Sequence, residues 1–173
     1  YTGKITTNAS GISISTNTTD GGHLTTTGGW KNGEGSKFWK ISFSTLNYKN
    51  LKISSKQRSS NSGPRDFKLQ YSYNDSEWYD LPYTNIEVAN DFDLGKLENY
   101  ALPKEIEFKS QVYIRWLMSS NTNVNGGNVA DTGTSRIDDV VIVGDFINST
   151  RQHIEGLPFR NIQTNSKEIT GVN

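Results

Sequence analysis

The chain of 173 residues has no cysteine, one methionine and only two histidines. Without cysteine it can form no disulfide framework, thiol nucleophile or thiolate metal site. No apolar run approaches the roughly 18 residues of a membrane-spanning helix, so no membrane span is predicted. The 18 basic and 18 acidic side chains balance. This balance argues against nucleic acid as a partner, because non-specific binding to nucleic acid needs a globally basic surface.

Small polar residues dominate what is present: 18 Asn, 19 Ser and 17 Thr fill 54 of the 173 positions. A chain of this length is expected to form one domain with a genuine core. The composition is typical of a secreted all-β module with many loops, although the missing cysteine would also fit the cytosol. Of the two we favour secretion or the bacterial cell surface.

Alternation of apolar and polar residues recurs along the chain, and helical periodicity is almost absent. Only residues 93–100 show helix-like spacing. Strands are predicted at residues 11–15, 38–44, 50–58, 66–72, 77–81, 105–108, 111–118 and 136–143. About eight strands separated by turns indicate an all-β fold, an antiparallel β-sandwich of the jelly-roll type.

Two connections matter for the organisation of this sandwich. The polar stretch 119–135 is too long for a hairpin, so we expect it to cross between sheets or to line a binding edge. After Gly144 the strand pattern weakens. We therefore predict a β-sandwich binding module over residues 1–144, followed by a tail or linker over residues 145–173.

Two segments carry a resemblance to a known family. The first contains Gly29-Trp30, the strand from Trp39 to Ser44, residues 55–72 with the turn Asn-Ser-Gly-Pro-Arg-Asp, and Trp78; the second is residues 134–144. Together they resemble the jelly-roll accessory modules of bacterial extracellular proteins, which are similar to carbohydrate-binding modules with a galactose-binding-like fold. Such modules accompany glycoside hydrolases, surface-anchored proteins and some extracellular nucleases. The resemblance covers residues 1–144 and says little about the ligand.

A candidate binding surface comes from the outward positions of four predicted strands, which hold Lys40, Lys52, Lys56, Arg58, Lys68, Gln70, Tyr113 and Arg115. If these strands share one sheet, the surface is basic, amide-bearing and aromatic, as recognition of sugar hydroxyls requires. Its sign would favour acidic glycans or a phosphate backbone. The alternative is a solvated sheet face whose lysines prevent edge-to-edge pairing. We select Arg58, Gln70, Tyr113 and Arg115 as ligand-binding residues.

The tryptophans divide into two groups. Trp39, Trp78 and Trp116 fall on apolar strand faces, which predicts that they pack in the core. Trp30 follows Gly28 and Gly29 in a predicted loop. We expect Trp30 to be an exposed platform on which a sugar ring stacks.

Adjacent carboxylates, Asp138 and Asp139, begin the last predicted strand, so one of them should point inward. A buried carboxylate must be paired or bind a metal ion. Calcium is the hypothesis here, with Asp20, Glu34 and Asp131 as further oxygen ligands. The family resemblance also implies a structural calcium. The alternative is an ion pair with Arg115 or Arg136.

These observations favour a non-catalytic module that attaches a larger extracellular bacterial protein, through its other domains, to a polysaccharide. One alternative is a structural or protein-interaction module of a cell-surface protein. Another is an accessory domain of an extracellular hydrolase or nuclease. Catalysis is poorly supported, because no nucleophile elbow, Walker loop or distinctive carboxylate pair occurs in the sequence.

Overall fold

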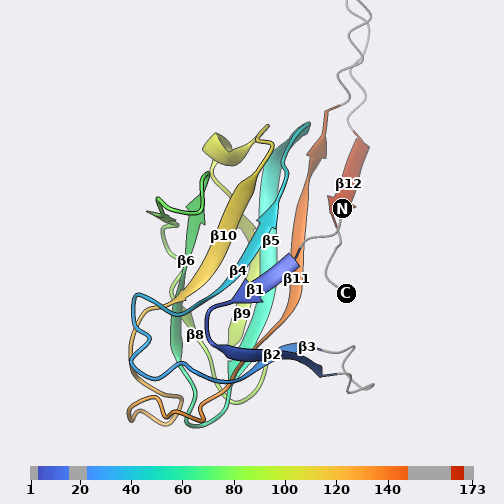
Figure 1. Cartoon of the computed structure of the whole chain (residues 1–173). Helices are drawn as coiled ribbons and strands as arrows, with labels where there is room; N and C mark the ends of the chain where they lie inside the picture. Colours follow the sequence, from blue (N-terminus) through green and yellow to red (C-terminus); the bar gives the residue numbers. More distant parts are fainter. Residues whose placement is uncertain (1–3, 16–22, 148–164, 170–173) are drawn as a thin grey trace, which may run out of the picture.

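Two antiparallel sheets lie face to face in the computed structural model, which describes residues 4–15, 23–147 and 165–169 (Figure 1). Sheet A has the strand order β1 (Lys4–Thr7), β4 (Phe38–Phe43), β10 (Val112–Met118), β6 (Asp66–Ser72) and β7 (Tyr79–Asp80), and β8 (Ile86–Glu87) also pairs with β6. Sheet B has the order β2 (Ser10–Ser15), β3 (His23–Gly28), β11 (Ser135–Phe146), β5 (Tyr48–Ser59) and β9 (Gly95–Ala101), with β12 (Asn165–Ile169) on β11. The predicted jelly-roll β-sandwich is confirmed.

The long strands alternate between the two layers along the chain. β3, β5, β9 and β11 belong to sheet B, whereas β4, β6 and β10 belong to sheet A. Each connection between them therefore crosses from one sheet to the other, as in a jelly roll. Residues 119–134 join β10 to β11, which confirms that the polar stretch crosses between the sheets.

The helix-like spacing of residues 93–100 was misleading, because this segment contains most of β9, the edge strand of sheet B. Ile53 pairs with Tyr100 and Ser55 pairs with Leu97, so three steps along β9 match two along β5. Such a bulge places residues three apart on the same face. Leu97 and Tyr100 both pack against the core, and their spacing imitates a helix.

Other departures concern short elements. Residues 105–108, expected as a strand, overlap the 3-10 helix η1 (Lys104–Ile106), whose Ile106 is buried. Strands β1, β3, β8 and β12 were not expected. The predicted boundary at Gly144 falls inside β11, which continues to Phe146 and pairs with β12. Residues 148–164 of the predicted tail lie outside the described residues.

The core contains two indoles that connect the sheets. Trp39 of β4 donates from Nε1 to Ser135 Oγ of β11 at 3.0 Å, and Trp116 of β10 donates to Ser55 Oγ of β5 at 3.1 Å. Both indoles are fully buried. A buried N–H must find an acceptor, so these two bonds hold sheet A and sheet B in register.

Trp30 is the third core indole, and its expected role as an exposed platform is wrong. It is 0% exposed, and its Nε1 donates to Thr26 Oγ1 at 2.7 Å. The preceding Gly28 and Gly29 have φ of 145° and 80°, a conformation that glycine adopts readily. They bend the chain so that Trp30 packs edge-on against Phe67, at 5.7 Å between ring centroids.

Replacing Ser55 with Ala tests the contribution of the bonds between the sheets. The variant leaves the Trp116 N–H buried without its acceptor, which should cost about 1–3 kcal/mol of unfolding free energy in urea. Ser110→Ala, at an exposed position, is the control and should change that free energy by less than about 0.5 kcal/mol. Equal stability of the two variants would contradict the role given to the bond.

Candidate functional site

A row of polar side chains crosses the outer face of sheet A. Lys40 of β4 lies opposite Arg115 of β10, Arg115 lies opposite Gln70 of β6, and Gln70 lies opposite Asp80 of β7. Side chains of a strand alternate between its two faces, and the neighbouring Trp39, Trp116 and Leu69 point inward and are fully buried. Lys40, Arg115 and Gln70 therefore lie on the outer face. We call Lys40, Arg115, Gln70 and Asp80 the polar row.

Hydrogen bonds fix the centre of the polar row. Arg115 Nε donates to Gln70 Oε1 at 2.7 Å, and Gln70 Nε2 donates to Asp80 Oδ1 at 2.6 Å. Lys68 Nζ donates to Asp80 Oδ2 at 2.9 Å. Both ends of the Gln70 amide are thus engaged, and the amide can take only one orientation that satisfies both neighbours.

Aromatic rings surround the Arg115 guanidinium. Its Cζ lies 4.0 Å from the centroid of the Trp78 ring and 5.4 Å from that of Phe38. Tyr113, two residues before Arg115 on β10, has its ring 5.8 Å from Lys40 Nζ. Burial lowers the pKa of Arg115, and the charges of Asp75 and Asp80 oppose this effect. The guanidinium stays charged, because its ordinary pKa exceeds about 12.

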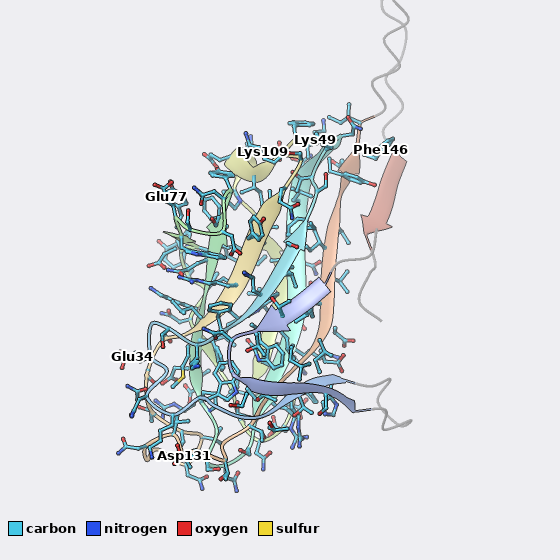
Figure 2. All side chains as sticks on the ribbon, in the orientation of Figure 1. Glu34, Lys49, Glu77, Lys109, Asp131 and Phe146 are labelled. Carbon is cyan, nitrogen blue, oxygen red and sulfur yellow. The ribbon has the colours of Figure 1, made fainter. Side chains whose placement is uncertain are left out.

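The position of Trp78 corrects the expectation that it packs in the core. It is half-buried and stacks against Arg115 on the outer face. Figure 2 shows its neighbour Glu77 at the margin of the β6 side of the sandwich, far from Phe146 at the end of β11. Trp78 immediately precedes β7 and lies two residues before Asp80. This spacing is the feature of the sequence that indicates a shared face for the two side chains.

The charges on this surface are more balanced than the sequence indicated. Lys40 pairs with Asp75 at 2.6 Å, and Lys68 pairs with Asp80 at 2.9 Å. Arg115 is the cation of the row that makes no ion pair with another described residue. The surface therefore presents donors, acceptors and ring edges around one net positive charge.

The structure brings together some of the predicted binding residues and separates others. Gln70, Tyr113 and Arg115 share the outer face of sheet A with Lys40 and Lys68. Arg58 does not belong to this surface, since β5 lies in sheet B together with Lys52 and Lys56. Successive strands alternate between the layers, so the strand between β4 and β6 in the sequence falls in the opposite sheet.

The predicted calcium ligands, Asp138 and Asp139, have other partners. Asp138 Oδ1 accepts the backbone N–H of Asp139, and burial raises the pKa of Asp138. Asp139 Oδ2 pairs with Lys56 Nζ at 2.6 Å. Within the described part of the chain no group of three or more His, Asp or Glu side chains could hold a metal ion. Backbone carbonyls and waters would therefore have to supply most of the roughly six to eight oxygen ligands of a calcium ion here.

The remaining carboxylates proposed for calcium lie elsewhere. Asp131 pairs with Lys31 at 2.9 Å, and Glu34 accepts from Asn121 Nδ2 at 3.1 Å. Both are labelled at the end of the sandwich opposite Lys49 (Figure 2). Asp20 lies outside the described residues. Calcium at Asp138 and Asp139 stays a prediction.

Among solved structures, the chain is similar to one described as "CBM4 structure and function". It aligns with a TM-score of 0.47 and 17% identity, over 82% of this chain and 86% of that one. These values are too low to assign a family or a ligand. No family model and no curated protein matches the chain. In the described ranges, no helix has the length and apolar character needed to cross a bilayer.

The hydrogen bonds to Asp80 make its titration a test of the polar row. Bonds from Gln70 first and Lys68 second keep the pKa of Asp80 below its ordinary value, against a smaller effect of burial. A lowered folded-state pKa contributes stability above the unfolded pKa of about 3.9, and this stability is lost as the pH falls through the folded pKa. Carboxyl NMR should show a lowered midpoint that rises in Gln70→Ala. An unchanged midpoint in that variant would argue against the Gln70 bond.

A structural calcium at Asp138 and Asp139 makes a separate prediction. An ion bound only by the folded state stabilises it by mass action, so EDTA should lower the melting temperature and added calcium should restore it. Asp138→Asn should remove this response to calcium. A melting temperature that EDTA leaves unchanged would exclude the calcium hypothesis.

Proposed function

We propose that the outer face of sheet A binds polysaccharide and that the module is non-catalytic. The observation that carries this proposal is the fixed Arg115, held between the Gln70 amide and the Trp78 ring in the middle of a four-strand polar row. Sugars need this combination, because their hydroxyls exchange hydrogen bonds with planar polar groups and their ring faces pack on aromatic surfaces.

Recognition follows from groups that are already in place. Arg115 uses Nε for Gln70, which leaves its other guanidinium N–H groups for ligand oxygens. The exposed Asp80 offers carboxylate oxygens with remaining acceptor capacity, and Tyr113 and Trp78 offer ring surface beside it. Pre-organised side chains lose little conformational freedom on binding, which favours affinity. The net affinity stays modest, because each polar contact replaces one with water.

The biological setting is part of the same proposal. A rigid sheet that presents a sugar-binding face suits a targeting domain, which keeps the other domains of a secreted or surface-bound bacterial protein near a polysaccharide. The resemblance of residues 1–144 to accessory modules of such proteins supports this setting. The alternatives are a structural or protein-interaction module and an accessory domain of an extracellular hydrolase or nuclease.

Retention of the full chain on neutral polysaccharides, in affinity gels and on insoluble particles, tests the proposal. Arg115→Ala removes a charge-assisted donor worth about 1.5–3 kcal/mol, so the apparent affinity should fall about 10- to 100-fold. Trp78→Ala should also weaken retention, since it removes the ring that holds the guanidinium.

Arg58→Ala is the matched control, because it removes the same half-buried residue type from the opposite sheet. It should leave retention on a neutral polysaccharide unchanged. The proposal fails if no polysaccharide in a broad panel retains the chain. It also fails if Arg115→Ala and Arg58→Ala lower the retention equally. Binding to another protein without any retention would instead favour the protein-interaction alternative.

A further inference from the structure

Two arginines meet on the outer face of sheet B. Arg58 of β5 and Arg136 of β11 are direct partners in the antiparallel register. Side chains at such positions have Cβ atoms about 4.5–5.5 Å apart, and like charges placed there destabilise a sheet. This arrangement favours the presence of a negative group beside the two guanidinium groups.

The described residues do not supply that negative group. None of the seven ion pairs among them includes Arg58 or Arg136. The buried Nε atoms of both guanidinium groups also lack a hydrogen-bond partner in the described ranges. The pKa of Arg136 is lowered by burial and further by the charge of Arg58, so the two cations do interact.

Neighbouring groups hold Arg58, one member of the arginine pair, in place. Arg58 Nη2 donates to Asn90 Oδ1 at 2.8 Å, and its Cζ lies 5.5 Å from the centroid of the Phe92 ring. Phe92 also contacts the edge of His23 on β3, at 5.6 Å between centroids. The ring of Phe92 thus reaches from β5 towards β3, the strand on the far side of β11. It restricts the motion of Arg58 without neutralising it.

The nearest carboxylate on the same strand does not fill this role. Asp138 follows Arg136 by two residues on β11 and belongs to the same face. The charges that act on its carboxyl group are those of Asp139, His23 and Lys56, and neither arginine is among them. Asp138 also makes no ion pair with Arg58 or Arg136.

We propose that Arg58 and Arg136 form an oxyanion site for a carboxylate or sulfate group of an acidic saccharide. A planar guanidinium matches such groups with two parallel N–H···O bonds, and two of them can share one anion. The choice of a saccharide as carrier rests on the proposed function, whereas the oxyanion site rests on the arginine pair. It lies on the opposite sheet from the polar row, so one module would recognise two chemically different parts of a polysaccharide.

Affinity electrophoresis of the full chain tests this site with three probes: polygalacturonate for carboxylate, dextran sulfate for sulfate, and uncharged dextran as the control. The chain should be retarded by at least one charged polymer. Arg136→Gln and Arg58→Gln should each weaken this retardation about 10- to 100-fold. Arg58→Lys keeps the charge but loses the bidentate geometry, so it should weaken binding as well.

Arg136→Gln separates this proposal from the one for sheet A, since it should weaken retardation by the charged polymers and leave retention on a neutral polysaccharide unchanged, whereas Arg115→Ala should weaken both. If Arg115→Ala abolishes that retardation and Arg136→Gln does not, the oxyanion site is refuted while the sheet A site gains support. Absence of retardation by both charged polymers also refutes it. Loss of one like charge should not impair folding, and a melting scan of Arg136→Gln without ligand confirms that the variant is folded.

Discussion

The hydrogen bonds from buried indoles to hydroxyls are the constraint on which the rest of the structure depends. Trp39 reaches Ser135 and Trp116 reaches Ser55, so each bond ties a strand of sheet A to a strand of sheet B. Once these indoles point inward, their neighbours Lys40 and Arg115 must point outward, because successive residues of a strand alternate. The core thereby determines which residues form the candidate binding surface.

The same alternation in β5 determines which residues lie on the outer face of sheet B. Ser55 faces the core to accept from Trp116, which directs Arg58, three residues on, to the outer face opposite Arg136. The two outer faces thus differ in charge balance. On sheet A, Lys40 and Lys68 form ion pairs with Asp75 and Asp80. On sheet B, neither arginine of the pair forms an ion pair with a carboxylate of the described residues. The core separates the two surfaces, so each can be altered without touching the other.

Much of this could be predicted from the sequence, within a physical limit. Alternation correctly located the inward residues of β4, β6 and β10, and with them Gln70, Tyr113 and Arg115. It could not place Arg58, because a strand pattern does not reveal which sheet the strand joins. The alternation pattern also failed for Leu97 and Tyr100, because a bulge in β9 changes the spacing of residues on one face. The burial of Trp30 was missed because the positive φ angles of Gly28 and Gly29 bend the chain towards the core.

The central claim is that the outer face of sheet A is the polysaccharide-binding surface. The most direct test is an NMR titration of the full chain with a fragment of a neutral polysaccharide that retains the chain. The account predicts changes at the N–H signals of Trp78, Gln70 and Arg115, with the core indoles of Trp39 and Trp116 and the guanidinium of Arg136 unaffected. Changes confined to sheet B or to the loops, with sheet A unchanged, would contradict it.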